Sequence, residues 1–288
     1  QLVYTASIRG DMKLCGVKNK ESTLRSTTVP GHGVLSLTVS TDGRVVCMGC
    51  MDGRIVFYDV ESDSIRHETI AHADAVSGAL FVSGGIITCG WDSFVRSWQW
   101  DKANIANAEM KLVGATKDHV GEILCMDVNS ELEEILSGGA DGTLWLWKYA
   151  KKISRCVFHT SENAHVTSAR YLHSCGKEPL AAVALSSGTV KIIEIESSSV
   201  RNQLEFGGLC KAIATKGSIL VCGGGSSIMV SNWETGDKVG TLHLEDEDAS
   251  SLLDICISEV RLLIFYSIFI YYINSSRNFF KKNFISSF

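Results

Sequence analysis

The side chains of this chain that could carry out chemistry are histidines, hydroxyls and aspartates that recur at matched distances. His72 precedes Asp92 by 20 residues, with Thr88 between them, and His119 precedes Asp141 by 22 residues. Histidine, hydroxyl and carboxylate are the components of a nucleophilic triad, in which the histidine activates the hydroxyl. A catalytic triad is expected once in a chain, whereas this arrangement recurs. We therefore interpret these residues as structural hydrogen-bond partners and expect no catalytic residue.

The same residues mark a repeat of about 43 residues that organises positions 1–258. Each unit has a short apolar strand, a turn, and a second strand that ends six positions after the turn. The turn positions are Arg9, Asp52, Asp92, Asp141, Ser187 and Gly225. The positions six residues later are Cys15, Tyr58, Trp98, Trp147, Ile193 and Ser231. The constant offset predicts one supersecondary unit repeated along the chain.

Alternation of apolar and polar residues predicts that the repeat is built from β-strands. In the segment 35–39 the odd positions are apolar and the even positions are polar. Asp-Gly pairs at 52–53 and 141–142 supply the residues that tight hairpins require. The best candidate for a helix, 102–118, is interpreted as an inserted loop. The chain is therefore predicted to be all-β, with four short strands in each unit, as in a β-propeller blade.

Two segments carry a resemblance to a known family. They are Gly90–Trp98, with the sequence GWDSFVRSW, and Gly139–Trp147, with the sequence GADGTLWLW. At these residues the chain resembles the WD40 family, which implies a β-propeller of four-stranded blades, with six recognisable units and a broken seventh. Seven blades in the parent protein, or six with an overlapping closing strand, both fit this count. Arg9 in place of the turn acid and Ile193 in place of tryptophan depart from the family pattern.

The resemblance implies a buried hydrogen-bond network in each blade, made of a histidine, a hydroxyl, the turn aspartate and the tryptophan. A network in which every polar group has a partner favours a single strand register. Two complete sets and one partial set are present: His72, Thr88, Asp92 and Trp98; His119, Ser137, Asp141 and Trp147; and His32, Asp52 and Tyr58.

The resemblance also implies where a partner binds, because the residue before the turn aspartate lies on one rim of such a fold. Ile8, Met51, Trp91 and Ala140 occupy this position in the first four units. Trp91 either anchors a protein partner or folds back onto its own blade, and the sequence leaves both open. The formal net charge of −5 argues against nucleic acid and favours proteins or basic peptides as partners.

Two further motifs are interpreted as structural. Cys47-Met48-Gly49-Cys50 is a single C-x-x-C within a predicted strand, without a second pair at a zinc spacing. Gly223-Gly224-Gly225-Ser226 lacks the following lysine and helix of a phosphate loop. We expect no metal and no cofactor. The ten cysteines show no disulfide framework, so reduced thiols and a cytoplasmic location are expected.

The composition changes at Glu259. Residues 259–288 contain 9 of the 24 aromatic residues and a single acid, whereas residues 1–258 contain 23 bases and 31 acids. We predict a propeller domain over 1–258, with incomplete first and last blades, and a separate tail over 259–288. A translated intron, or a natural tail that binds a membrane surface or a partner, would explain this composition. Because the first residue is Gln1, we expect a longer parent protein, and no apolar run is long enough for a transmembrane helix.

A narrower resemblance concerns the segment 71–77, AHADAVS, and the GWDS at 90–93. This region is similar to the C-terminal propeller of BEACH–WD40 proteins of the neutral sphingomyelinase activation-associated factor group. That resemblance implies an adaptor in receptor or lipid signalling and membrane traffic, with peripheral membrane association through the parent protein. Two alternatives remain: a substrate receptor of a ubiquitin ligase or a chromatin reader, and an enzyme with a propeller fold.

Overall fold

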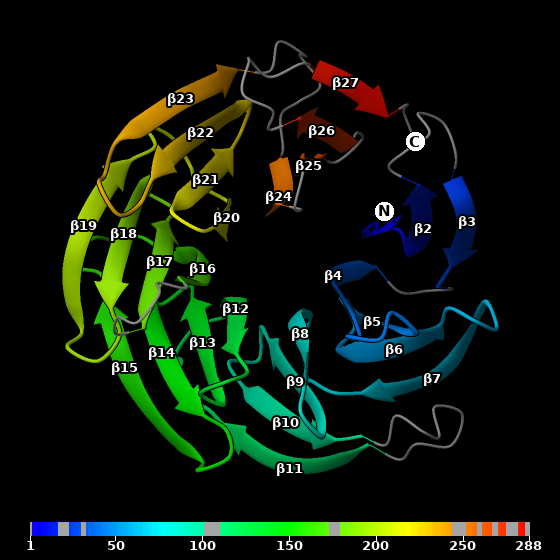
Figure 1. The fold of residues 1–288 in the computed structure, drawn as a ribbon. Coiled ribbons are helices and arrows are strands. Elements are labelled where there is room, and N and C mark those ends of the chain that lie inside the picture. Colours follow the sequence, from blue (N-terminus) through cyan, green and yellow to red (C-terminus); the bar gives the residue numbers. More distant parts are fainter. Residues whose placement is uncertain are drawn as a thin grey trace. The chain divides into compact units, whose positions relative to one another are not determined.

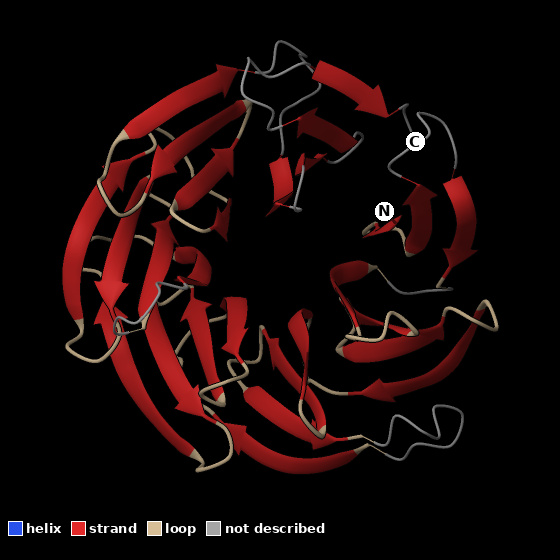
Figure 2. Cartoon of the chain, viewed as in Figure 1, coloured by secondary structure: helices blue, strands red, loops and turns tan. Residues whose placement is uncertain are grey.

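The computed structural model describes residues 2–16, 23–29, 33–100, 110–172, 179–243, 252–257, 261–266, 270–274 and 282–285. All regular secondary structure in these residues is β-strand (Figure 2). The chain divides into two compact units, Gln1–Cys156 and Val157–Phe288, and their boundary falls within strand β15. The prediction of an all-β chain without helices is thus confirmed for the described residues.

The first unit contains four sheets of strands that follow one another in the sequence (Figure 1). The first sheet has three strands in the order β1-β2-β3, and each later sheet has four. The strands are β1 (Leu2–Ala6), β2 (Asp11–Gly16), β3 (Thr23–Thr28), β4 (Val34–Val39), β5 (Val45–Cys50), β6 (Arg54–Asp59), β7 (Ser64–Ile70), β8 (Val76–Val82), β9 (Gly85–Gly90), β10 (Val95–Gln99), β11 (Lys111–Thr116), β12 (Ile123–Asn129), β13 (Glu134–Gly139), β14 (Thr143–Lys148) and β15 (Ile153–His159).

The second unit contains three four-stranded sheets with the same order. Its strands are β16 (Val166–Leu172), β17 (Leu180–Leu185), β18 (Thr189–Glu194), β19 (Ser199–Glu205), β20 (Ala212–Lys216), β21 (Ile219–Gly224), β22 (Ser227–Asn232), β23 (Lys238–His243), β24 (Leu252–Ile257), β25 (Arg261–Tyr266), β26 (Ile270–Asn274) and β27 (Lys282–Ile285). The last sheet joins β24 to strands from the unusual C-terminal segment. The domain boundary after residue 258 stays a prediction.

Burial falls from the second strand of each sheet to the fourth. Every residue of β5, β9 and β13 is buried, whereas exposed residues recur along β7 and β11. The second strand is covered on both faces by neighbouring sheets, so it is apolar on both faces rather than alternating. The fourth strand lies at the edge and carries the charged residues that keep an exposed edge soluble.

The turn between the second and third strands requires a left-handed backbone at the residue after the turn position. Glycine occupies it in two of the complete sheets of the first unit, at Gly53 (φ 83°) and Gly142 (φ 73°). Ser93 occupies it in the third sheet with φ 69°. This conformation is unfavourable in free energy for any residue that has a Cβ atom.

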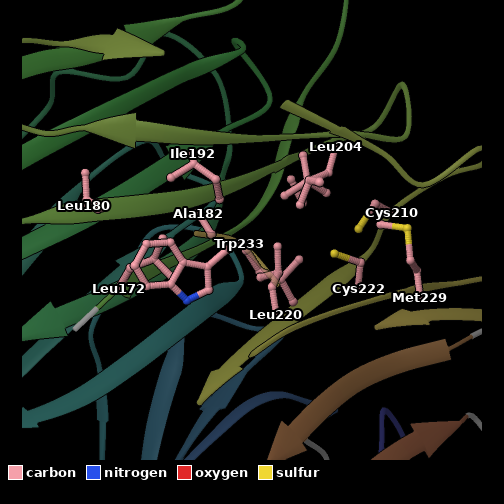
Figure 3. Packing of buried hydrophobic residues seen from close by; sticks show 13 residues of the cluster. Leu172, Leu180, Ala182, Ile192, Leu204, Cys210, Leu220, Cys222, Met229 and Trp233 are labelled. Carbon is pink, nitrogen blue, oxygen red and sulfur yellow. The ribbon is translucent and has the colours of Figure 1, made fainter. Parts of the chain in front are cut away.

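Neighbouring sheets are joined by apolar packing. In the first unit Trp100 stacks on Phe57 with ring centroids 5.3 Å apart, and it also contacts Phe81 at 5.5 Å. In the second unit a cluster of 13 buried residues, including Leu204 and Trp233, fills the space between two sheets (Figure 3). Close packing of this kind excludes water from the strand ladders and fixes the sheets against one another within each unit.

A hydroxyl from the first strand of a sheet also bonds to a carbonyl at the start of the next sheet. Ser36 Oγ donates to Val76 O (3.2 Å), and Ser77 Oγ donates to Ile123 O (2.6 Å). In the second unit Thr167 Oγ1 donates to Cys210 O (2.6 Å). We call these contacts the inter-sheet hydroxyl bonds. Ser77 and Thr167 are the second residues of their strands, and Ser36 is the third residue of β4.

We predict that Ser93→Gly stabilises the protein. Glycine relieves the left-handed strain at this turn, and part of that gain is offset by the greater freedom of glycine in the unfolded chain. We expect the free energy of unfolding to rise by about 0.5–1 kcal/mol in urea denaturation. Gly142→Ala, the reverse change at the equivalent turn, should lower it. A loss of stability in Ser93→Gly would contradict the strain argument.

Candidate functional site

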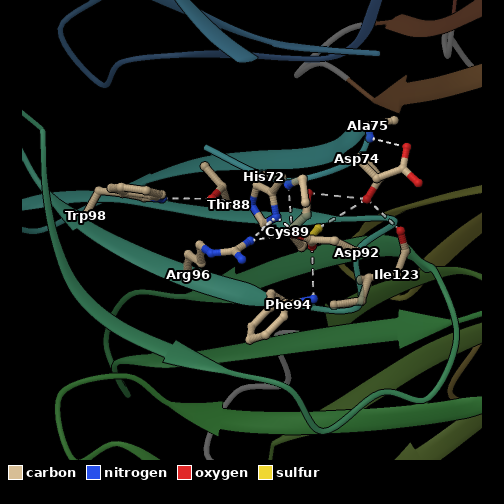
Figure 4. A network of polar contacts seen from close by, with 12 residues as sticks. His72, Asp74, Ala75, Thr88, Cys89, Asp92, Phe94, Arg96, Trp98 and Ile123 are labelled. Atoms are coloured by element: carbon tan, nitrogen blue, oxygen red, sulfur yellow. Dashed lines mark hydrogen bonds and ion pairs between the residues drawn. The ribbon is translucent and has the colours of Figure 1, made fainter. Parts of the chain in front are cut away.

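The residues predicted to form the most complete network lie together in the sheet β8–β11 (Figure 4). His72 Nδ1 lies 2.8 Å from Asp92 Oδ1, and His72 Nε2 lies 2.7 Å from Thr88 Oγ1. The indole of Trp98 donates from Nε1 to Thr88 Oγ1 at 2.9 Å. His72 precedes β8, Thr88 lies on β9, Asp92 in the turn and Trp98 on β10, so one sheet supplies all four.

One arrangement of protons gives every polar atom of these four side chains a partner; Arg96 Nη1 also lies 2.6 Å from His72 Nδ1. Trp98 is a donor only, so it must donate to the hydroxyl oxygen of Thr88. The Thr88 hydroxyl then donates to His72 Nε2, and His72 Nδ1–H donates to the Asp92 carboxylate. Neutral His72 with the proton on Nδ1 therefore leaves no polar atom of the four unpaired, which is the condition for burying such a set.

The carboxylate of Asp92 collects further donors. It accepts from the backbone amide of Ala73 at 3.1 Å, and Arg96 Nη1 donates to Oδ2 at 2.7 Å. Burial opposes ionisation of Asp92, but the bonds from His72 and Arg96 outweigh it and lower the pKa to about 2. Burial lowers the pKa of His72, because it disfavours the charged imidazolium, and this effect outweighs the opposing effect of Asp92. Both shifts favour a neutral imidazole beside an ionised carboxylate.

The second predicted set lies in the sheet β12–β15 and differs in its last member. His119 Nε2 lies 3.0 Å from Ser137 Oγ, and His119 Nδ1 lies 3.1 Å from both Asp141 carboxylate oxygens. Trp147 is buried, but no hydrogen bond from its indole to Ser137 is found among the described residues. Trp147 instead packs in the core between this sheet and the preceding one.

Thr143 adds a branch that the first network lacks. Its hydroxyl donates to Asp141 Oδ1 at 2.7 Å and accepts from the indole of Trp145 at 3.0 Å. The Trp145 ring also stands edge-on to His119, with centroids 6.4 Å apart. Trp145 is thus half-buried over its own sheet and covers the histidine.

The third predicted set is not assembled in the described part of the chain. His32 lies outside the described residues. Asp52 pairs with Arg54 at 3.4 Å, and the Tyr58 hydroxyl bonds to Asp63. Met48 occupies the position that corresponds to Thr88, so this sheet offers no hydroxyl for the network.

Two glycines of the site escaped the sequence reasoning. A Cβ atom on Gly90 would lie 2.7 Å from His72 Nδ1, and one on Gly139 would lie 2.6 Å from His119 Nδ1. The histidine ring therefore lies against the bare backbone of the second strand, which only glycine allows. The sequence does contain a signal for this role, because a glycine precedes the turn aspartate by two residues in both segments, 90–98 and 139–147.

The geometry of both networks suits a structural role rather than nucleophilic catalysis. Thr88 is 0% exposed and Ser137 is 2% exposed, so neither hydroxyl can reach a substrate carbonyl. Each histidine already uses both ring nitrogens within the protein. A general base needs a free nitrogen near a proton that it can abstract, and the described geometry leaves none.

The four predicted rim residues lie in the turns at one end of the strands. Ile8 is 69% exposed and Met51 is 46% exposed, while Trp91 and Ala140 are half-buried. Val120, which the sequence reasoning did not include, is 92% exposed and donates its amide to Asp141 Oδ2 at 2.9 Å. Its backbone is thus held by the buried network of its own sheet while its side chain is exposed.

The remaining motifs belong to the strand core. Burial raises the pKa of the Cys50 thiol to about 12 and raises that of Cys47 well above its usual range, so both stay protonated. Gly223 and Gly224 lie on β21, and Gly225 follows with φ 55° as a turn residue. In the described part of the chain, no three His, Cys, Asp or Glu side chains are arranged to hold a metal ion. No helix there has the length and hydrophobicity to span a bilayer.

Two protein-family models match parts of the chain. Residues 3–94 match the anaphase-promoting complex subunit 4 WD40 domain, and residues 110–148 match the WD domain, G-beta repeat. Together with the four-stranded antiparallel sheets, these matches confirm the predicted fold class, a WD40-type β-propeller.

Several proteins are similar to part of the chain. The LEC14B protein of Lithospermum erythrorhizon is 33% identical over 42% of this chain and 26% of its own length. Cilia- and flagella-associated protein 52 of Mus musculus is 25% identical over 58% of this chain and 28% of its own length. Autophagy-related protein 16 of Arabidopsis thaliana is 23% identical over 48% of this chain and 26% of its own length. The matches span less than a third of each relative.

A solved structure resembles the whole fold. The crystal structure of the computationally designed Ika8 protein superposes with a TM-score of 0.69. The match covers 92% of this chain and 78% of that protein at 18% sequence identity. At this identity the likeness describes the fold alone.

We predict that Asp92→Ala destabilises the protein by about 1–3 kcal/mol, because it leaves the Nδ1–H of buried His72 and the Arg96 guanidinium without their acceptor. Urea denaturation measures the change. Asp74→Ala, in an exposed position of the same loop, serves as the control and should change stability by less than about 0.5 kcal/mol. Equal losses of stability in the two variants would show that the network does not stabilise the fold.

We also predict that acid weakens the fold from about pH 6.5 downwards. The pKa of His72 is lowered in the folded state, so below its ordinary value of 6.5 the unfolded chain binds a proton that the folded chain does not. Stability from His72 is therefore complete above pH 6.5 and declines as the pH falls. Denaturant titrations between pH 5 and pH 7.5 should show a smaller decline in His72→Gln, and an identical decline would contradict this assignment.

Proposed function

We propose that this chain, with its WD40-type fold, is a non-catalytic module that binds other proteins through the turns of its first unit. The observation that carries this proposal is a row of apolar side chains on these turns, of which Ile8, Met51 and Val120 are exposed and Trp91 is half-buried. Exposed apolar groups held on a rigid scaffold are a common basis of protein recognition. The buried networks supply that rigidity beside Trp91 and Val120.

Contacts between successive turns support the continuity of this row. A Cβ atom on Gly33 would lie 2.4 Å from Ile8 O and 2.9 Å from Met51 Sδ, so these two residues flank the same glycine. A Cβ atom on Gly53 would lie 2.2 Å from His72 O, which places the Met51 turn against the loop before β8.

The row continues through the next two sheets. The Asp92 carboxylate, beside Trp91, binds the Ala73 amide in the loop before β8. Lys117 Nζ lies 5.2 Å from the centre of the Phe94 ring, which connects the Trp91 turn to the loop that carries Val120. Aromatic and aliphatic side chains on adjoining turns fit a partner segment that presents apolar side chains.

The overall charge supports the character of the partner. Acids exceed bases in the chain, with a formal net charge of −5, so we propose a peptide segment with apolar anchors and basic flanks. Nucleic acid is excluded from the proposal on the same ground. We propose a cytoplasmic setting, consistent with the free thiols of Cys47, Cys89 and Cys222.

The cellular role is proposed from the narrower sequence resemblance. The segments 71–77 and 90–93 support an adaptor of the BEACH–WD40 type, which would couple receptor or lipid signalling to membrane traffic. The match of residues 3–94 to a subunit of the anaphase-promoting complex supports the alternative of a ubiquitin-ligase component. Affinity purification of the full-length protein separates the two, since trafficking partners favour the first and ligase subunits favour the second.

We predict that Trp91→Ala and Met51→Glu weaken partner binding at least tenfold, because they remove or charge the apolar anchors. Binding is measured with partners recovered by affinity purification and then purified. Leu132→Glu is the control, since Leu132 is also exposed but lies at the opposite end of β13 from the rim turn. Unchanged binding in both rim variants would overturn the proposed surface, and unfolding of Trp91→Ala would place that ring in the core.

A further inference from the structure

The turn between the third and fourth strands of a sheet is closed by its own side chains in two of the sheets. Between β6 and β7 the hydroxyl of Ser62 donates to the Asp59 carboxylate at 2.9 Å. Between β18 and β19 the hydroxyl of Ser197 donates to the Glu194 carboxylate at 3.1 Å. In each turn a serine and an acid are paired with one another, so the turn satisfies its own polar groups.

The equivalent turn between β14 and β15 has the opposite chemistry. Lys148 occupies the position of the acid, and Lys151 occupies that of the serine. Lys152 and Ile153 follow, and both are exposed, as Lys151 is, with Ile153 57% exposed. Two bases and an aliphatic side chain therefore face solvent where the other turns have a serine bound to an acid.

Strand β11 of the preceding sheet brings a second set of such side chains to the same place (Figure 1). Its first three residues, Lys111, Leu112 and Val113, are all exposed, the two aliphatic ones to 48% each. Lys152 Nζ donates to Val113 O at 3.0 Å. A Cβ atom on Gly114 would lie 3.8 Å from Lys152 Cε, so the lysine stem lies along β11. These contacts join the exposed residues of β11 and of the turn into one surface.

We call this surface the lysine patch, and it combines three exposed bases with three exposed aliphatic side chains: Lys111, Lys151, Lys152, Leu112, Val113 and Ile153. Among the described residues, none of these lysines forms an ion pair with an acid, whereas the neighbouring Lys148 is paired with Glu134 at 2.6 Å. Glu131 and Glu133 lie in the turn before β13, the second strand, rather than beside the fourth strands. The patch is thus locally basic, although the chain as a whole has a formal net charge of −5.

The composition of the patch favours a lipid surface over a protein partner. Protein interfaces are enriched in aromatic residues and arginine and depleted in lysine, and the patch has the opposite composition. Addition of a partner strand to β11 is also hindered, because the pairing of β10 with β11 skips Val113 and because Lys152 occupies the Val113 carbonyl. Lysines beside protruding aliphatic side chains are instead suited to a bilayer surface, where the ammonium groups reach the phosphates and the aliphatic groups enter the headgroup region.

We propose that the lysine patch binds the surface of a bilayer that contains anionic phospholipids. The three aliphatic side chains of the patch enter the headgroup region, and the three lysines bind lipid phosphates. Because the patch has only three bases, the attachment is weak, peripheral and reversible. Lys111 pairs with Gln99, at the end of β10 away from the Trp91 turn, so the patch and the apolar rim lie at opposite ends of these strands. A membrane at the patch therefore leaves the rim accessible to a protein.

The test measures co-sedimentation of the full chain with lipid vesicles. Phosphatidylcholine vesicles that contain about 30% phosphatidylserine should bind the chain about tenfold more strongly than vesicles of phosphatidylcholine alone. Added salt should weaken this binding, because it screens the attraction between the lysines and the lipid. Equal binding to both kinds of vesicle, or binding to neither, would overturn the proposal.

Matched substitutions assign the binding to the patch. Lys238 and Val239 are likewise an exposed lysine and an exposed aliphatic residue, on β23, a fourth strand of the second unit. Lys151→Glu should weaken binding to the anionic vesicles about tenfold, and Ile153→Asn should weaken it by a smaller factor. Lys238→Glu and Val239→Asn alter the charge and the apolar surface of the chain in the same way and should leave vesicle binding nearly unchanged.

Circular dichroism verifies that all four variants retain the fold, as expected for exposed side chains. Equal losses of binding in Lys151→Glu and Lys238→Glu would trace the binding to the overall charge and overturn the patch. Recovery of an acidic protein whose binding requires Lys151, without any binding to vesicles, would make the patch a protein interface and would also overturn the proposal.

Discussion

A buried imidazole, hydroxyl, carboxylate and indole can lie in an apolar sheet only if each finds a hydrogen-bond partner among the others. This constraint governs the described structure. In the sheet β8–β11 the requirement is met completely by His72, Thr88, Asp92 and Trp98. The bonds join the loop before the first strand to the second strand, the turn and the third strand. A register slip would separate the partners and leave buried groups unpaired, so the network selects one register.

The same positions remain buried where the polar residues are absent. Met48 and Tyr58 replace the hydroxyl and tryptophan in one sheet, and Val183 and Ile193 replace them in another, all four at 1% exposure or less. The repeat therefore conserves a core position rather than a chemistry. A sheet meets the constraint either with a closed polar network or with apolar residues alone, and both avoid an unsatisfied buried group.

This constraint also explains how the rim turns can present apolar side chains. Asp92 and Asp141 are held by histidine and backbone amides, so Trp91 and Val120 beside them are carried on fixed backbone. Val120 shows the connection directly, because its amide is bound to Asp141 while its side chain faces solvent. Rigid presentation lowers the entropic cost of binding.

The sequence by itself determined the repeat, the all-β class, the turn positions, the four residues of the first histidine set and three of the four in the second. These features depend on spacing within one sheet, where strand register converts separation along the chain into contact. Only the tertiary structure decided that Trp147 packs in the core without bonding Ser137, and that Arg96 and Thr143 join the networks. It also decided that Gly90 and Gly139 must lack a side chain, and that Ile8 and Met51 flank one glycine. Such contacts depend on side-chain direction and on packing between sheets, and neither is encoded in a spacing.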